Sequence, residues 1–271
     1  MKKAKQVALI GGGSLSDFPL AQIRWLSEQL GPVKASSLRL ASRIANGLGA
    51  GRPVKEYREL DSARFILIAV PSAANAGVVA ELLAAPMSWR GKTVALLSAA
   101  MDSGALTDFS ARGANVATLC AIAGFERSYL IEGDPPAVRA TRRLIESRTT
   151  RVIVVERENK GSYLLAEKCT GRLFFALVSA ASDCLHYAGL SRSASAPILE
   201  RQFEESLRAY LRGGLRARPS PCDVDRALRS LTAEDPNLAR YLEDSVRLAR
   251  QIFGDRDQAG SSAARSSAVG V

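Results

Sequence analysis

Three consecutive glycines interrupt the first apolar run of the sequence, in the stretch VALIGGGSLSDFP at residues 7 to 19. In a dinucleotide-binding turn, one glycine permits a tight turn, a second lets the backbone approach a pyrophosphate, and a third lets helix and strand pack closely. Gly11, Gly13 and Ser16 occupy these places, and a helix capped by Ser16 admits Pro19 in its first turn. The amides expected to face an anion belong to Gly12, Gly13, Ser14 and Leu15. An ordinary strand-to-helix turn is the alternative.

Hydroxyl and basic side chains follow the second expected strand, at residues 33 to 37. An NAD site usually presents an acidic residue here for the ribose hydroxyls, whereas a 2′-phosphate favours hydroxyl and basic groups. The sequence places Ser36, Ser37, Arg39 and Arg43 at this point. No acidic residue follows them before Glu56, so we predict NADP as the cofactor. The alternative is that both arginines are ordinary surface residues of a basic protein.

Other candidates lie where further strands are expected to end, because open α/β sheets bind ligands outside the carboxyl ends of their strands. Val70 and Pro71 close a near-continuous apolar strand and are expected to contact the cofactor. Ser98 closes the strand that begins at Thr93, and we expect it to face the same crevice. Tyr163, at the start of a long helical pattern, is expected to reach this cleft, where a small-molecule substrate would lie.

The charge and cysteine patterns argue against other classes of function. The chain has 271 residues and a net charge of +10, but its basic residues are spread over both halves and form no stripe, which does not favour nucleic-acid binding. Its four cysteines form no C-x-x-C pair and do not cluster with the one histidine, His186, so we predict no metal site and reduced, mostly buried thiols. No apolar run is long enough for a membrane span and no signal peptide is evident, so we expect a cytoplasmic protein.

Strand and helix patterns alternate over the first part of the chain and give way to helical patterns alone. We therefore predict an α/β fold, with a doubly wound domain followed by an all-helical domain. Expected helices include 19–30, 136–147, 162–188 and 198–212. The predicted domains are 1–157, 158–256 and a disordered tail at 257–271, which is poor in large apolar residues.

The chain resembles a bacterial family that joins a Rossmann-like domain to a helical domain of unknown function, DUF2520. The matching pieces are VALIGGGSLS, FILIAVP at 65 to 71, IEGD at 131 to 134, Tyr163, Ala166, AGL at 188 to 190 and CDVDRALRSL at 222 to 231. The wider relatives are NADP-dependent reductases of the pyrroline-carboxylate, ketopantoate and 6-phosphogluconate dehydrogenase groups. The resemblance implies an NADP-binding oxidoreductase-like protein that commonly forms a homodimer through its helices.

The resemblance also bears on catalysis. In the related β-hydroxyacid dehydrogenases a lysine on the long helix protonates the developing alkoxide, which makes Lys168 a candidate, although Arg172 stands where those enzymes carry an asparagine. Members of the family often carry a His-x-Ser-Gly turn after the fifth strand and a His-Pro further on, and here these places read Ser98-Ala99-Ala100 and Cys120-Ala121. We therefore expect hydride transfer between nicotinamide and a small molecule. The alternative is a non-catalytic sensor or scaffold that keeps the nucleotide fold.

Overall fold

The computed structural model describes residues 6–13, 26–145, 149–214, 224–249 and 251. The chain forms two compact units, Met1–Lys168 and Cys169–Val271. The domain boundary expected at residue 157 stays a prediction. The helix cap expected at Ser16, the helix start at Pro19 and the tail at 257–271 lie outside the described residues.

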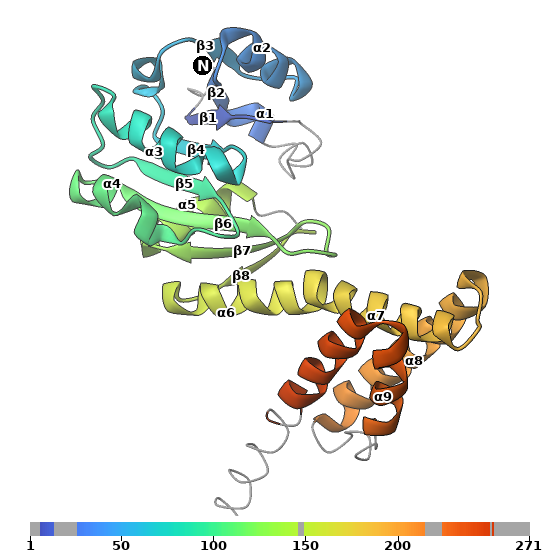
Figure 1. The fold of residues 1–271 in the computed structure, drawn as a ribbon. Helices are drawn as coiled ribbons and strands as arrows, with labels where there is room; N and C mark the ends of the chain where they lie inside the picture. Colours follow the sequence, from blue (N-terminus) through green and yellow to red (C-terminus); the bar gives the residue numbers. More distant parts are fainter. Residues whose placement is uncertain (1–5, 14–25, 146–148, 215–223, 250, 252–271) are drawn as a thin grey trace, which may run out of the picture. The chain divides into compact units, whose positions relative to one another are not determined.

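The first unit is built on one eight-stranded sheet (Figure 1). Its strands are β1 (Val7–Gly11), β2 (Leu30–Lys34), β3 (Arg52–Val54), β4 (Phe65–Ala69), β5 (Thr93–Leu97), β6 (Asn115–Ala121), β7 (Ser128–Gly133) and β8 (Arg151–Val154). Their order is β3-β2-β1-β4-β5-β6-β7-β8. The first six strands run parallel, while β7 is antiparallel to β6 and parallel to β8. This is the strand order of a dinucleotide-binding fold, with its topological switch point between β1 and β4.

Helices cover both faces of the sheet, as the continuous apolar strands require. The helices of this unit are α1 (Leu26–Gln29), α2 (Leu38–Gly47), α3 (Asn75–Ala84), α4 (Thr107–Ala111), α5 (Pro135–Ile145) and α6 (Arg157–Lys168). Ile44 of α2 and Leu144 of α5 pack on one face, against Leu9 and Leu67. Leu82 of α3 and Phe109 of α4 pack on the other face. The doubly wound α/β prediction is therefore confirmed.

The second unit is helical throughout its described part. Its helices are the π-helical turn η6 (Cys169–Leu173), α7 (Phe174–Tyr187), α8 (Arg192–Gly213), α9 (Asp225–Glu234) and a helix over 236–249. The rings of Phe174 and Phe203 join α7 to α8 edge to face, with their centroids 5.0 Å apart. Gly189 ends α7 with a φ of 88°, as the sequence predicts.

Several sequence expectations are wrong in detail. The second strand begins at Leu30 rather than at residue 33, so it contains Pro32 and takes up the end of the helix expected at 19–30. The register of β1 against β2 shifts between Val7 and Leu9, and such an irregularity accommodates a residue that lacks an amide hydrogen. The long helix begins at Arg157 rather than Ser162 and is interrupted by the π turn. Among the described cysteines only Cys120 is buried.

The IEGD segment at the end of β7 has a structural explanation for each polar or glycine position. Gly133 has a φ of 134°, and a Cβ there would lie 2.4 Å from the Val116 carbonyl oxygen. The Asp134 carboxylate accepts a hydrogen bond from the Val116 amide at 2.8 Å, and the Asp134 amide donates to the Val116 carbonyl. Glu132 is fully buried and belongs to the network described below. Gly133 is needed because backbone atoms of Val116 and Ala117, rather than a movable side chain, occupy the space that its Cβ would take.

We predict that Gly133→Ala lowers the free energy of unfolding by about 2–3 kcal/mol, since the new methyl group meets rigid backbone at a φ that side chains rarely adopt. Urea unfolding followed by circular dichroism measures this. Gly161→Ala is the matched control, because nothing lies within 4 Å of a Cβ at that helical position. An unfolding midpoint for Gly133→Ala equal to that of the control would contradict this explanation.

Candidate functional site

A pocket of about 390 Å³ lies at the carboxyl ends of the central strands. Its described lining residues are Gly12, Val70, Pro71, Ser72, Leu97, Ser98, Ala99, Cys120, Ala121, Ala123 and Glu167. The structure thus brings together four of the residues that the sequence singles out: Gly12, Val70, Pro71 and Ser98. Gly12 follows β1 and Val70 follows β4, so the pocket opens at the topological switch point, where this fold binds ligands.

The glycine turn lies close against the end of β4. The Gly12 amide donates to the Ala69 carbonyl oxygen at 3.1 Å. A Cβ on Gly12 would lie 3.3 Å from side-chain atoms of both Val70 and Pro71, and Gly13 has a φ of 79°. The two glycines therefore let the backbone of this turn pass close to Val70 and Pro71 beside the pocket. Ser14 and Leu15, predicted to complete the anion-binding turn, lie outside the described residues.

The residues predicted to select NADP surround the start of α2. Ser37 caps this helix, with its hydroxyl accepting from the Leu40 amide at 3.2 Å. Ser36, Arg39 and Arg43 are exposed, and the two arginines are one helical turn apart on the same side of α2. No acidic residue lies in the first turn of α2. This end of β2 therefore presents hydroxyl and guanidinium groups to solvent, which suits a phosphate ester.

Ser98 is fixed in place by three backbone or side-chain contacts. Its amide donates to the Leu119 carbonyl at 2.9 Å, and its hydroxyl oxygen accepts from the Met101 amide at 3.0 Å. Its carbonyl oxygen accepts a hydrogen bond from the ammonium of Lys160, at 2.9 Å. The residue is only 5% exposed yet lines the pocket, so the backbone after β5 forms a rigid part of the pocket wall.

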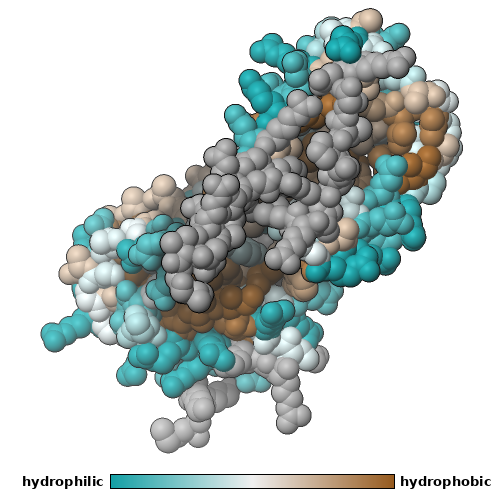
Figure 2. Space-filling model, turned by 90° about the horizontal axis from the view of Figure 1, so that it is seen from below, coloured by the Kyte–Doolittle hydropathy of each residue, from teal (hydrophilic) through white to brown (hydrophobic). Residues whose placement is uncertain are grey.

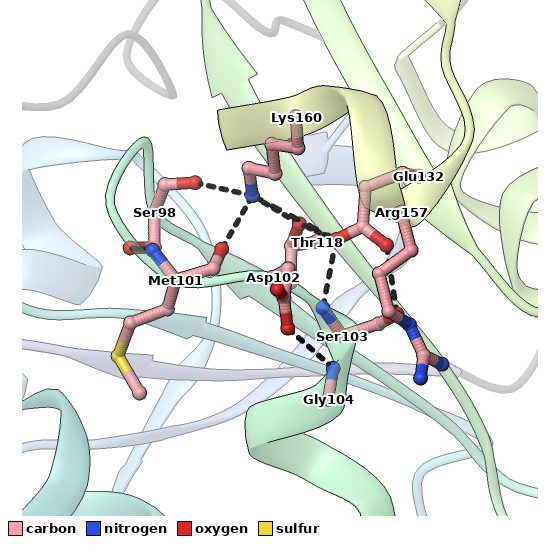
Figure 3. Close-up of polar contacts among 9 residues, drawn as sticks. All are labelled: Ser98, Met101, Asp102, Ser103, Gly104, Thr118, Glu132, Arg157 and Lys160. Carbon is pink, nitrogen blue, oxygen red and sulfur yellow. Dashed lines mark hydrogen bonds and ion pairs between the residues drawn. The ribbon is translucent and has the colours of Figure 1, made fainter. Parts of the chain in front are cut away.

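Lys160, on α6, is the centre of a buried polar network that sequence reasoning missed (Figure 3). Its ammonium donates to the carbonyls of Ser98 and Met101 and to the Thr118 hydroxyl. It also lies 3.7 Å from a carboxylate oxygen of Glu132, and both side chains are at most 3% exposed. The three N–H groups of the ammonium are therefore all satisfied.

Glu132 is held by several donors in addition to the lysine. The amide of Ser103 donates to one carboxylate oxygen at 2.8 Å, and the Ser103 hydroxyl donates to the other at 2.7 Å. The Thr118 hydroxyl also donates to the carboxylate, at the same oxygen as the Ser103 amide. Arg157 donates in turn to the Ser103 hydroxyl at 3.0 Å. The signal in the sequence was the lone carboxylate inside an apolar strand, because a buried charge requires a partner.

Desolvation lowers the pKa of Lys160, and the nearby carboxylate of Glu132 opposes that shift. The lysine has no donor left for a substrate. Its contacts instead tie the segment after β5 to β6 and β7. We interpret Lys160 as a positioning residue beneath the pocket.

The three residues predicted to be catalytic have different surroundings. Ser98 lines the pocket, as described above. Lys168 has a half-exposed side chain that pairs with Glu167 at 3.5 Å, and it is not among the described lining residues. Tyr163 is partly buried; burial raises its pKa, and the carboxylate of Glu167 raises it further. Catalytic roles for these three residues stay predictions.

Cys120 and Glu167 line the pocket but were not predicted as site residues. Burial raises the pKa of the Cys120 thiol, the Lys160 ammonium opposes the shift, and the carboxylates of Glu167 and Glu132 add to it. Cys120 therefore stays a neutral thiol at neutral pH. Among the described residues there is no group of three or more metal-ligating side chains, and no described helix is long and apolar enough to cross a membrane.

We predict that Lys160→Met destabilises the protein by about 3–5 kcal/mol, because the carboxylate of Glu132 would stay buried without its cation. Urea unfolding checks this. Adding Glu132→Gln should recover part of the loss, since the unpaired charge is then removed. Additive losses in the double variant would show that the two side chains are not coupled.

We also predict that iodoacetamide modifies Cys120 at least about tenfold more slowly than the exposed Cys169 at neutral pH, because thiolate, not thiol, reacts. Peptide mass spectrometry over a time course measures the two rates separately. Faster modification of Cys120 would mean that its thiol is ionised or open to solvent.

The fold has clear counterparts among known structures. No protein-family model matches the chain, and no curated protein sequence matches it. A proposed NADP oxidoreductase from Bacteroides fragilis matches with a TM-score of 0.65 and 16% identity, over 94% of this chain and 99% of that chain. A protein from Thermotoga maritima matches with a TM-score of 0.63 and 16% identity, over 92% of this chain and 99% of that chain. A reductive aminase from Aspergillus terreus was solved with NADPH and ethyl-5-oxohexanoate. It matches with a TM-score of 0.67 and 16% identity, over 92% of this chain and 94% of that chain. The chain therefore shares the Rossmann-like fold of these proteins.

Proposed function

We propose that this protein is an NADP-dependent oxidoreductase that transfers hydride between nicotinamide and a small molecule. The observation that carries the proposal is the pocket at the switch point, bounded by Gly12 on one strand end and by Val70, Pro71 and Ser98 on two others. The glycine turn suits a dinucleotide, because side chains at Gly12 or Gly13 would crowd the end of β4. The reductive aminase with the same fold was solved with NADPH.

The residues have distinct roles under this proposal. Backbone amides of the glycine turn would hold the pyrophosphate, and Arg39 and Arg43, with the hydroxyls of Ser36 and Ser37, would hold the 2′-phosphate. When bound, the cofactor would supply or accept hydride. The rigid backbone at Ser98 would form the wall beside the reacting groups, and Tyr163 would be a candidate to donate a proton. Lys168 is a weaker candidate, because its ammonium already pairs with Glu167.

A non-catalytic nucleotide-binding sensor or scaffold is the second candidate. No histidine lies among the described residues that line the pocket, where Ser98 and Cys120 stand in place of the histidines common in the DUF2520 family. Two lysines are buried in the described part of the chain, Lys92 and Lys160. Lys92 does not line the pocket. The ammonium of Lys160, next to the pocket, is fully engaged by protein groups. A protein with these features could bind NADP without turning over a substrate.

We also propose membership of the DUF2520 family and a homodimer formed by the helical unit. Large apolar side chains of this unit are exposed, including Phe175 at 74% and Leu211 at 73%. Apolar patches reach the surface on the face drawn in Figure 2. Extended exposure of such side chains is typical of a surface that another copy covers.

We predict that NADPH binds at least about tenfold more tightly than NADH, and that Arg39→Ala removes most of this preference, because the guanidinium would lose its charge-assisted contact with the 2′-phosphate. Fluorescence titration with both nucleotides measures the dissociation constants. Arg90→Ala is the control, since Arg90 is exposed and lies near the start of β5, at the opposite end of the strands from the pocket.

The outcomes separate the candidate functions. Equal affinities for the two nucleotides would contradict the NADP assignment, and no binding of either would overturn the proposed function as a whole. Tight NADPH binding without turnover of ketones, imines or hydroxy acids would favour the sensor.

A further inference from the structure

Two neighbouring hydrogen-bond donors lie in the wall of the pocket without an acceptor. The Ser98 hydroxyl oxygen accepts from the Met101 amide at 3.0 Å, but its own hydrogen has no acceptor among the described groups. The amide of Ala99 likewise donates to no group in the described part of the chain. Both residues follow β5 and line the pocket. The wall therefore offers an O–H and an N–H from consecutive residues.

The direction of the Ala99 amide follows from the contact on the other side of the same peptide group. The Ser98 carbonyl oxygen accepts from the ammonium of Lys160 at 2.9 Å, and the Lys160 side chain is only 3% exposed (Figure 3). The peptide bond between Ser98 and Ala99 is trans, so its N–H points opposite to its C=O. Because the carbonyl faces the buried ammonium, the N–H faces away from it, on the side where Ala99 borders the pocket.

Lys160 also makes this amide a stronger donor. A cation that binds a carbonyl oxygen draws electron density from the peptide group, because hydrogen bonds in a chain polarise one another. The carboxylate of Glu132 lies 3.7 Å from the ammonium and offsets part of its charge, whereas the Ser98 carbonyl is in direct contact with it. A second contact of the ammonium, with the Met101 carbonyl, holds the turn that carries both donors.

We propose that the Ser98 hydroxyl and the Ala99 amide form a subsite that binds a carbonyl oxygen. Such an oxygen has two lone pairs and can accept from both donors at once. The identity of its owner rests on the proposed oxidoreductase function, under which the carbonyl group belongs to the substrate or to the carboxamide of nicotinamide. Small and apolar residues line most of the rest of the described pocket and suit the carbon framework of either.

The first test follows the binding of a ketone and of nicotinamide to the full chain, without nucleotide. Cyclopentanone is compared with methylenecyclopentane, in which a methylene group replaces the oxygen, and nicotinamide with pyridine, which lacks the carboxamide. We expect a carbonyl probe to move the Ala99 amide proton downfield in proton–nitrogen NMR spectra, while its oxygen-free counterpart does not. A shift caused by cyclopentanone assigns the subsite to the substrate, and a shift caused by nicotinamide alone assigns it to the cofactor.

A variant of Ser98 tests the other donor. We expect Ser98→Ala to weaken the binding of the carbonyl probe about fivefold, as the loss of one hydrogen bond does, and to leave its oxygen-free counterpart unaffected. Ser88→Ala is the matched control, because Ser88 is exposed and is not among the described lining residues. Circular dichroism checks that both variants keep the fold, and the Ala99 shift is measured on the unsubstituted chain in any case.

An Ala99 amide proton that neither carbonyl probe moves would overturn the inference. Equal binding of the carbonyl probe to Ser98→Ala and to the unsubstituted chain would also overturn it. Because every probe is titrated without nucleotide, these results do not depend on the NADPH titration of the proposed function. Failure of the subsite and failure of the proposed function are therefore distinguishable.

Discussion

The buried ammonium of Lys160 is the interaction on which the geometry of the pocket depends. An ammonium removed from water must have all its donors satisfied, and here the partners come from the segment after β5, from β6 and, through the carboxylate of Glu132, from β7. These segments are far apart in the sequence. Their relative positions set where the backbone of Ser98 stands, and Ser98 forms part of the pocket wall.

An apolar residue at position 160 could fill space but could not impose this arrangement. Main-chain carbonyls at Ser98 and Met101 point at one atom, so the loop after β5 has little freedom to change shape. The same contacts occupy the lysine fully. Lys160 therefore acts here through position, by holding the backbone that forms part of the pocket wall.

The sequence predicts the architecture well because local patterns carry it. Continuous apolar strands alternating with amphipathic helices predicted the doubly wound sheet, and strand ends predicted that Gly12, Val70, Pro71 and Ser98 lie together. The network of Lys160 was missed because its partners meet only in the folded chain. The sequence favours Lys168, whereas its neighbour Glu167 is the residue that lines the pocket. Successive helical residues differ by about 100° in direction, so the rotation of α6 about its axis, which the local pattern does not fix, decides which one lines the pocket.

A crystal structure of the NADPH complex tests the central claim most directly, because it locates both ends of the cofactor at once. The account predicts the 2′-phosphate beside Arg39 and Arg43, the pyrophosphate over the glycine turn, and the nicotinamide in the pocket lined by Ser98, Cys120 and Glu167. A cofactor bound elsewhere, or a nicotinamide directed away from this pocket, would contradict it.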